Sequence, residues 1–258
     1  MEHLGLGLVL LVRTLAAGNP LFFQSIKEKV LDMAPTSFDD QYQGCIRMME
    51  EELVELNRTE FAKNSVYAQY WTEAAAEWRE REDLVHKPSA LRTEHAVALM
   101  AYTLQERLYK EFNAAVREAG RSLREYLDSF HFKVLHFLVI QALRILHKPQ
   151  TCFNVFRGVR GTRFTARHHD LVRFGQFAST SLNKEEAKEF GQDTFFLVNT
   201  CYGVPVEKFS AFPGEEEVLI PPFEKFEVTS ITQVGKSTRI QLNSSGTFSN
   251  YNCEWVKG

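Results

Sequence analysis

The sequence predicts an α+β fold in which a helical N-terminal half precedes a half made of β-strands. In the first half, apolar residues recur at the three- and four-residue spacing of amphipathic helices. After Pro149 they gather in short segments rich in Phe, Val, Thr and Ile, which Gly and Pro separate. No repeat or break in composition divides the chain. We therefore expect one domain over 19–258, with a helical half over about 37–148 and a β half over about 150–258.

The first half is expected to be helical almost throughout. Apolar residues between 42 and 56 step by four, three, four and three, so one face of this helix is expected to be buried. A looser pattern of the same kind covers 60–81. Pro88 lacks a backbone donor and disfavours helix before it, which indicates a loop. Further helices are expected over 93–102, 106–119 and 122–147.

The second half is expected to hold six strands and one short helix. Asn183 suits the N-cap of a helix over 183–190, because its side chain can accept from backbone amides of the first turn. Glu185 and Glu186 favour the positive end of that helix. Strands are expected over 154–159, 176–182, 194–200, 217–220, 225–232 and 238–242.

Charge and motif composition exclude several classes of function. The 30 basic and 33 acidic residues give a net charge of -3, which offers no electrostatic basis for a nucleic acid partner. No HExxH occurs, and the eight histidines, including the adjacent His168 and His169, show no ligand spacing, so no metal is expected. Neither GxGxxG nor GxxxxGK[ST] occurs, so any dinucleotide site must be built differently.

The N-terminus and the cysteines indicate export. Residues 1–18 contain a short apolar run followed by small residues, which predicts a signal peptide; an amphipathic or disordered N-terminus is the alternative. The run is too short for a membrane span. Cys45, Cys152, Cys201 and Cys253 form an even set without CxxC spacing, which favours two disulfides, in any of three pairings.

Other features concern the exported product. Asn57 and Asn243 each begin a glycosylation acceptor pattern, which also occurs by chance. No hydrophobic tail follows Cys253, so neither a membrane helix nor a glycolipid-anchor signal is expected. We expect a secreted product.

Three clusters in the second half offer groups for chemistry. The first is FRGVR at 156–160, where Arg157 can present its planar fork to a phosphate or ribose and Gly158 can allow close approach of a ligand. A strand-end arginine in a surface ion pair is the alternative. The second is FASTSL at 177–182, where alternation places Ser179 and Ser181 on one face, so their hydroxyls can point into a shared polar site. Hydroxyl-rich strands are also common at solvent-facing edges.

The third cluster, FPGEEEVLIPP at 212–222, delivers three carboxylates into a hydrophobic strand. Period two predicts Glu215 and Glu217 on one face and Glu216 on the other. Two like charges on one face disturb each other's titration, which suggests a use. A charged strand opening is the alternative.

Together the three clusters resemble the arginine-specific ecto-ADP-ribosyltransferases of vertebrates, a family marked by an Arg, a Ser-x-Ser and a Glu-x-Glu in that order. The resemblance extends to SFDDQY at 37–42, KEFNAAVREAGRS at 110–122, FRGVRG at 156–161 and FPGEEEVLIPPFE at 212–224. It implies the fold of that family, a helical half packed on a mainly antiparallel β core. It also implies NAD, with NADP as an alternative, as the substrate, and arginine-containing extracellular or secreted proteins as acceptors.

The resemblance implies a role for each site residue. Arg157 would bind the nicotinamide-side ribose and phosphate, and the Gly158 backbone the carboxamide. Ser179 would orient Glu217, which would stabilise the oxocarbenium-like transition state. Glu215 would hold the acceptor guanidinium.

Phe190 would stack on nicotinamide, with core packing as the equal alternative. The implied disulfides are Cys45–Cys253 and Cys152–Cys201. An NAD glycohydrolase and a catalytically silent recognition module remain as rival functions, and granule storage as a variant of secretion.

Overall fold

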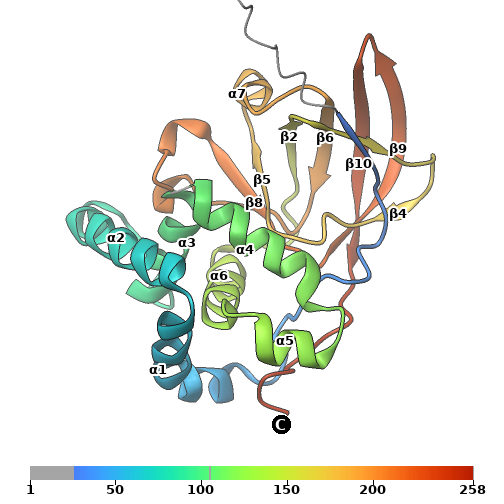
Figure 1. Cartoon of the computed structure of the whole chain (residues 1–258). Coiled ribbons are helices and arrows are strands. Elements are labelled where there is room, and N and C mark those ends of the chain that lie inside the picture. Colours follow the sequence, from blue (N-terminus) through green and yellow to red (C-terminus); the bar gives the residue numbers. More distant parts are fainter. Residues whose placement is uncertain (1–25, 105, 258) are drawn as a thin grey trace, which may run out of the picture.

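The protein has the expected α+β arrangement (Figure 1). The computed structural model describes residues 26–104 and 106–257. The signal peptide predicted over 1–18 lies outside the described residues. Most helices cluster on one side of the molecule, and the large sheet lies on the other side together with one short helix (Figure 1). The helices are α1 (Ile46–Lys63), α2 (Ser65–Arg81), α3 (Thr93–Leu104), α4 (Glu106–Ala119), α5 (Leu123–Ser129), α6 (Lys133–Leu146) and α7 (Lys184–Glu189), with short 3₁₀ helices η1 (Glu82–Leu84), η2 (Glu207–Phe209) and η3 (Pro213–Glu215).

Two helix predictions were wrong at their boundaries. The helix expected over 122–147 is broken into α5 and α6, because Glu60 of α1 caps the start of α6. Its carboxylate accepts from the backbone amides of Lys133 and Val134 at 2.7 and 3.0 Å. The helix expected from residue 60 begins only at 65, where Asn64 provides the N-cap. Both caps accept hydrogen bonds from backbone amides of the first turn, which have no acceptor within the helix.

The β half forms one large sheet and one small one. The large sheet has the strand order β4-β9-β10-β6-β2-β5-β8-β7, and only its β6–β10 pair is parallel within the described residues. The small sheet pairs β1 with β3 in parallel and was not expected from the sequence. The strands are β1 (Lys27–Val30), β2 (Phe153–Val159), β3 (Thr162–Thr165), β4 (Leu171–Val172), β5 (Ala178–Ser181), β6 (Thr194–Thr200), β7 (Val204–Pro205), β8 (Glu217–Ile220), β9 (Glu224–Val234) and β10 (Ser237–Thr247).

The two faces of the sheet pack into two different apolar clusters. Leu219 of β8 belongs to the larger cluster, which contains the buried faces of the helices. Val218 and Ile220, its neighbours on β8, belong to a smaller cluster on the opposite face. This alternation means that Glu217, two residues before Leu219, lies on the face that the helices cover.

Two disulfides fix distant segments of the chain. Cys45 is bonded to Cys253, and Cys152 to Cys201, across sequence separations of 208 and 49 residues. These are the two pairs that the family resemblance implies. No free cysteine occurs among the described residues.

The two predicted glycosylation sites differ in accessibility. Asn57 is half-buried in the middle of α1, where its Oδ1 accepts a hydrogen bond from the Tyr67 hydroxyl at 3.0 Å. Asn243 is exposed on β10. Glycosylation stays a prediction at both positions, and Asn243 is the more accessible.

Candidate active site

Three neighbouring strands of the large sheet carry the candidate residues. Arg157 lies on β2, Ser179 on β5 and Glu217 at the start of β8, and these strands are adjacent in the order β2-β5-β8. The structure thus brings together three motifs that lie far apart in the sequence. Ser181 of β5 pairs with Glu217 of β8, which sets the register between the last two strands.

Arg157 approaches the site from the edge of β2. Strict alternation would place it on the same face as Val155, two residues earlier, whose side chain packs in the smaller apolar cluster. In the described chain, only the pair Phe156–Ser181 joins β2 to β5. The guanidinium of Arg157 reaches across and donates to the backbone carbonyl oxygen of Ser179 at 2.5 Å. Within the described residues no carboxylate forms an ion pair with Arg157, so the ion-pair alternative finds no support there.

Glu217 is a buried carboxylate whose charge is only partly compensated. Its residue is 5% exposed, and burial raises its pKa to about 7. Hydrogen bonds from the hydroxyl groups of Ser179 and Ser210, and the charge of Arg157, lower this pKa, whereas the charge of Glu215 raises it. A carboxylate placed in this way titrates near neutral pH, which is typical of functional sites.

The turn before β8 corrects the geometry expected for the glutamates. Glu215 ends the 3₁₀ helix η3, and Glu216 has a left-handed backbone with φ of 48°. The strand begins only at Glu217, so the prediction that period two places Glu215 and Glu217 on one strand face was wrong. The two carboxylates are nevertheless near enough for the charge of Glu215 to raise the pKa of Glu217. Glu215 is half-buried, and burial together with the charge of Glu186 raises its own pKa.

The two serines of the second motif have different partners. Ser179 bonds to Glu217, and its Oγ lies 3.5 Å from the Tyr102 hydroxyl. Ser181 instead donates to the backbone carbonyl oxygen of Glu215 at 2.7 Å and accepts from the Asn183 amide at 2.9 Å. The expectation that both hydroxyls open into one polar site was therefore wrong for Ser181, which holds backbone on both sides of the site.

Gly158 is required by the packing of α7. A Cβ at this position would fall well inside contact distance of the carbonyl oxygens of Ala187 and Gly191. The space above the glycine is therefore filled by backbone of the α7 region. Phe190, which follows α7, is 52% exposed. Its exposure rules out the core-packing alternative and leaves its ring free to contact a ligand.

Four further residues adjoin the site and were not predicted from the sequence: Tyr102, Asn113, Arg117 and Ser210. Arg117 of α4 is half-buried, and burial and the nearby charge of Arg157 both lower its pKa. Asn113 and Arg117 lie one helical turn apart, so they share a face of α4. Polar residues at that spacing on the buried side of an amphipathic helix are the signal that was available.

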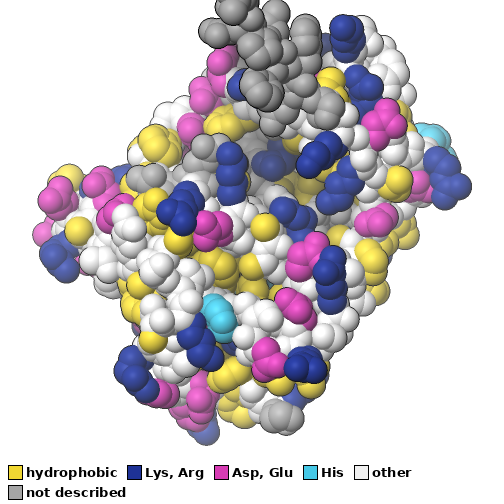
Figure 2. Space-filling model, viewed as in Figure 1, with side chains coloured by type: hydrophobic (Ala, Val, Ile, Leu, Met, Phe, Trp, Pro, Cys, Tyr) yellow, Lys and Arg dark blue, Asp and Glu magenta, His cyan; other side chains and the backbone are white. Residues whose placement is uncertain are grey.

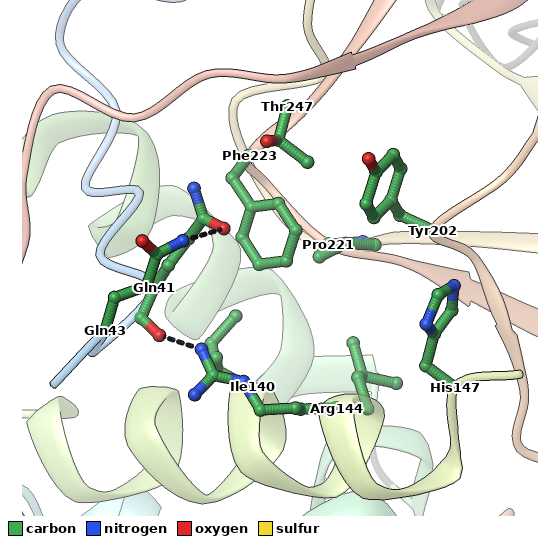
Figure 3. A pocket seen from close by; sticks show the side chains of 10 residues that line it. Gln41, Gln43, Ile140, Arg144, His147, Tyr202, Pro221, Phe223 and Thr247 are labelled. Atoms are coloured by element: carbon green, nitrogen blue, oxygen red, sulfur yellow. Dashed lines mark hydrogen bonds between the residues drawn. The ribbon is translucent and has the colours of Figure 1, made fainter. Parts of the chain in front are cut away.

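One face of the molecule is hollowed and basic between its helical part and its sheet (Figure 2). Figure 2 shows a hollow between the helical part and the sheet, with Lys and Arg side chains gathered around it. A second hollow, of about 370 Å³, is lined by other residues, among them Arg144, His147, Tyr202 and Phe223 (Figure 3). Because Phe223 follows β8 and Glu217 begins it, this cavity lies at the far end of that strand. It contains none of the candidate residues.

Two other kinds of feature are not found in the described part of the chain. No group of three or more His, Cys, Asp or Glu side chains between 26 and 257, residue 105 apart, is arranged to hold a metal ion. No single helix in this part is long and apolar enough to cross a membrane; α5 and α6 reach that length only together, across a bend of 105°.

Comparison with known proteins assigns a family. A family model described as NAD:arginine ADP-ribosyltransferase matches residues 31–250. The erythroblast NAD(P)(+)--arginine ADP-ribosyltransferase of Gallus gallus is 56% identical over 99% of this chain and 86% of its own length. The GPI-linked NAD(P)(+)--arginine ADP-ribosyltransferase 1 of Homo sapiens is 49% identical, over 92% of this chain and 76% of its own.

Solved structures of similar fold support the same family. The crystal structure of the eukaryotic mono-ADP-ribosyltransferase ART2.2 has a TM-score of 0.78 and 38% identity, and the match covers 87% of this chain and 98% of that one. A mutant of ART2.2 solved in complex with NAD has a TM-score of 0.77 and 37% identity over the same shares.

Proposed function

Because this chain belongs to the NAD:arginine ADP-ribosyltransferase family, we propose that Arg157, Ser179 and Glu217 cleave NAD and that Glu215 receives the acceptor. The enzyme transfers ADP-ribose from NAD to arginine side chains and releases nicotinamide. The observation that carries the residue assignment is the position of Glu217. It is a buried carboxylate at the start of β8, beside the Ser179 hydroxyl and within the field of Arg157.

Glu217 acts on the charge that develops as NAD is cleaved. The bond between the ribose anomeric carbon and the nicotinamide nitrogen breaks, and its electron pair leaves with nicotinamide. The ribose carbon thereby becomes oxocarbenium-like and positive. An ionised carboxylate fixed beside it stabilises that charge more strongly than water would, because burial excludes solvent. The Ser179 hydroxyl, bonded to Glu217, holds the carboxylate in one orientation.

The arginines of the site suit the diphosphate of NAD. Arg157 offers a planar guanidinium that can bind two phosphate or ribose oxygens at once. Arg117 lies near enough for the charge of Arg157 to lower its pKa. Two neighbouring cations repel each other, and an anion that binds between them relieves this repulsion. We therefore assign the phosphates of NAD to Arg157 and Arg117. Phe190 is free to stack on nicotinamide, and the Gly158 backbone is assigned to the carboxamide.

Glu215 is placed to receive the acceptor. A guanidinium has a pKa above about 12 and must lose a proton as its nitrogen attacks the ribose carbon. Half-buried Glu215 has a raised pKa, which makes its carboxylate a better proton acceptor than an ordinary surface glutamate. Its position one turn before Glu217 brings the acceptor nitrogen toward the carbon that loses nicotinamide.

The acceptors and the location of the enzyme follow from these assignments. We assign extracellular or secreted proteins with exposed arginines as acceptors, and export of the enzyme by its N-terminal segment. Two disulfides favour an oxidising compartment. We also assign residues 19–258 to one catalytic domain, since the larger apolar cluster contains helical residues together with Phe177, just before β5, and Leu219 of β8.

The test uses NAD that carries a label in its adenine. The purified protein is mixed with this NAD, with and without the arginine analogue agmatine. Label on agmatine, together with free nicotinamide, is the expected result. Free nicotinamide without labelled agmatine would instead identify an NAD glycohydrolase. Neither product would identify a catalytically silent recognition module.

A further inference from the structure

The side chain of Tyr102 connects the helical half of the protein to the candidate active site. Tyr102 lies on α3 and is 2% exposed. Its hydroxyl donates to the backbone carbonyl oxygen of Phe177 at 3.2 Å, just before β5 begins. The Ser179 hydroxyl, two residues after Phe177, lies 3.5 Å from the Tyr102 hydroxyl oxygen. One phenol therefore contacts the strand that carries Ser179 at two points.

A second helix fixes the orientation of this phenol. The side-chain amide of Asn113, on α4, donates to the Tyr102 hydroxyl at 3.1 Å. Asn113 is itself 2% exposed. The phenol ring packs against the rings of Phe112 and Phe177, with centroids 6.1 and 6.0 Å away. Ring packing and two hydrogen bonds thus leave the Tyr102 oxygen little freedom to move.

The number of hydrogen atoms limits how these groups can bond. A tyrosine hydroxyl has one hydrogen and can also accept, as can a serine hydroxyl. Tyr102 gives its hydrogen to Phe177 and accepts from Asn113, which leaves accepting capacity for Ser179. Ser179 has one hydrogen and two possible acceptors, the Tyr102 oxygen and the Glu217 carboxylate.

The charge of Glu217 decides between the two acceptors. When Glu217 is ionised, the Ser179 hydrogen goes to the carboxylate, because hydrogen bonds to a charged group are roughly twice as strong. The Ser179 oxygen can then accept the Tyr102 hydrogen in place of the Phe177 carbonyl oxygen. When Glu217 is protonated, that advantage is lost and the Tyr102 oxygen can take the hydrogen. In both states one hydrogen can therefore lie between the Tyr102 and Ser179 oxygens.

We propose that Tyr102 is a positioning residue of the transferase reaction, which acts by holding Ser179 in the rotamer that bonds to Glu217. This inference rests on the roles proposed for Ser179 and Glu217. It gives the helical half a part in catalysis, since α3 supplies the phenol and α4 supplies the amide that orients it. Tyr102 touches neither reacting atom, so its contribution passes entirely through Ser179.

A double-mutant cycle tests this dependence. Nicotinamide release is measured for the parent, Tyr102→Phe, Ser179→Ala and the double variant, with kcat and KM for NAD determined separately. Tyr102→Phe is expected to lower kcat about tenfold in the parent, and less than twofold when Ser179 is already alanine. KM for NAD is expected to change less than twofold. Tyr109→Phe is the matched control, since its half-buried ring packs against Tyr102 and its hydroxyl has no partner among the described residues.

Every outcome of this cycle either supports or overturns the positioning role of Tyr102. An equal loss from Tyr102→Phe in both backgrounds, or no loss in either, would overturn the positioning role while leaving the proposed function intact. Full activity of Ser179→Ala would overturn both, because Ser179 would then have no role to transmit. If circular dichroism shows that Tyr102→Phe does not fold, the same cycle is run with Asn113→Leu, which removes the donor that orients the phenol. The same non-additivity with Ser179→Ala is expected, and additivity overturns the proposal.

Discussion

Ser181 of β5 lies directly opposite Glu217 of β8, and its hydroxyl donates to the backbone carbonyl oxygen of Glu215 at 2.7 Å. One serine thus fixes both glutamates, since it sets the register of the strand that carries Glu217 and holds the turn that carries Glu215. The separation of the two carboxylates follows from this arrangement. Their different surroundings, one buried and one half-buried, lead to different predictions for each.

Replacing Glu217 by glutamine is expected to abolish both nicotinamide release and agmatine modification. Glutamine keeps the size of the side chain but removes the negative charge that stabilises the transition state. A loss of about 100-fold to 1,000-fold in kcat is expected, the range for removing one electrostatic contact of this kind. Both products are measured from the same reaction. Retention of more than a tenth of the parent rate would contradict the assignment.

Replacing Glu215 by glutamine is expected to separate the two activities. Transfer to agmatine should fall at least about tenfold, because the guanidinium loses its proton acceptor. Nicotinamide release with water as the acceptor should continue, since Glu217 and Arg157 are untouched. The ratio of labelled agmatine to free nicotinamide reports the effect. Glu216→Gln, on the exposed side of the turn, is the matched control and should keep the parent ratio.

The pH dependence of nicotinamide release is expected to follow the ionisation of Glu217. Its ionised form is the active one and its pKa is about 7, so kcat/KM should rise with pH and level off above about 7. Glu215→Gln removes a negative charge that raises this pKa, so the rise should move to lower pH. Arg157→Gln removes a positive charge that lowers it, so the rise should move to higher pH. Shifts of the same sign in both variants would contradict this electrostatic account.

The buried charge of Glu217 is also expected to cost stability. Its pKa is raised from 4.5 to about 7 on folding, so between these values the folded state binds more protons than the unfolded state. The free energy of unfolding therefore falls as pH rises through this window. Glu217→Gln should match the parent near pH 4 and exceed it by up to about 3 kcal/mol at pH 8. Urea titrations at both pH values measure the difference, and Glu60, also buried, contributes equally to both proteins.

Alanine at Gly158 is expected to be strongly destabilising. The added methyl group would collide with backbone carbonyl oxygens of the α7 region, which cannot move aside as a flexible side chain can. A loss of about 3 kcal/mol is expected, at the upper end for overpacking. Thermal unfolding measures it. Gly214→Ala is the control, because a Cβ there meets no atom within 4 Å and should change stability little.

Sequence patterns located most elements, and the misses have identifiable causes. The strands at 194–200 and 217–220 and the helix at 106–119 have the predicted bounds, since local turn signals delimit them. The break between α5 and α6 was missed because its cap comes from Glu60, a residue more than 70 positions away. The pairing of β1 with β3 is equally non-local.

The site was predictable in its residues and less so in its geometry. The three motifs identified the strands that carry the site. The predicted alternation of side chains was wrong at Glu215, because Glu216 adopts a left-handed backbone that no strand pattern reveals. Ser181 was expected to share a polar site with Ser179, and its hydroxyl instead holds backbone. Tyr102 was missed because a tyrosine in a helix full of buried apolar residues is indistinguishable from ordinary core.

The adjacency of β2, β5 and β8 has a practical consequence for anyone who produces this protein. The groups that split NAD meet only when three segments separated by tens of residues have found their neighbours in the sheet. A chain that has collapsed without completing those pairings has every reactive side chain and no reactive centre. Specific turnover is thus a more stringent assay of correct refolding than solubility or helix content.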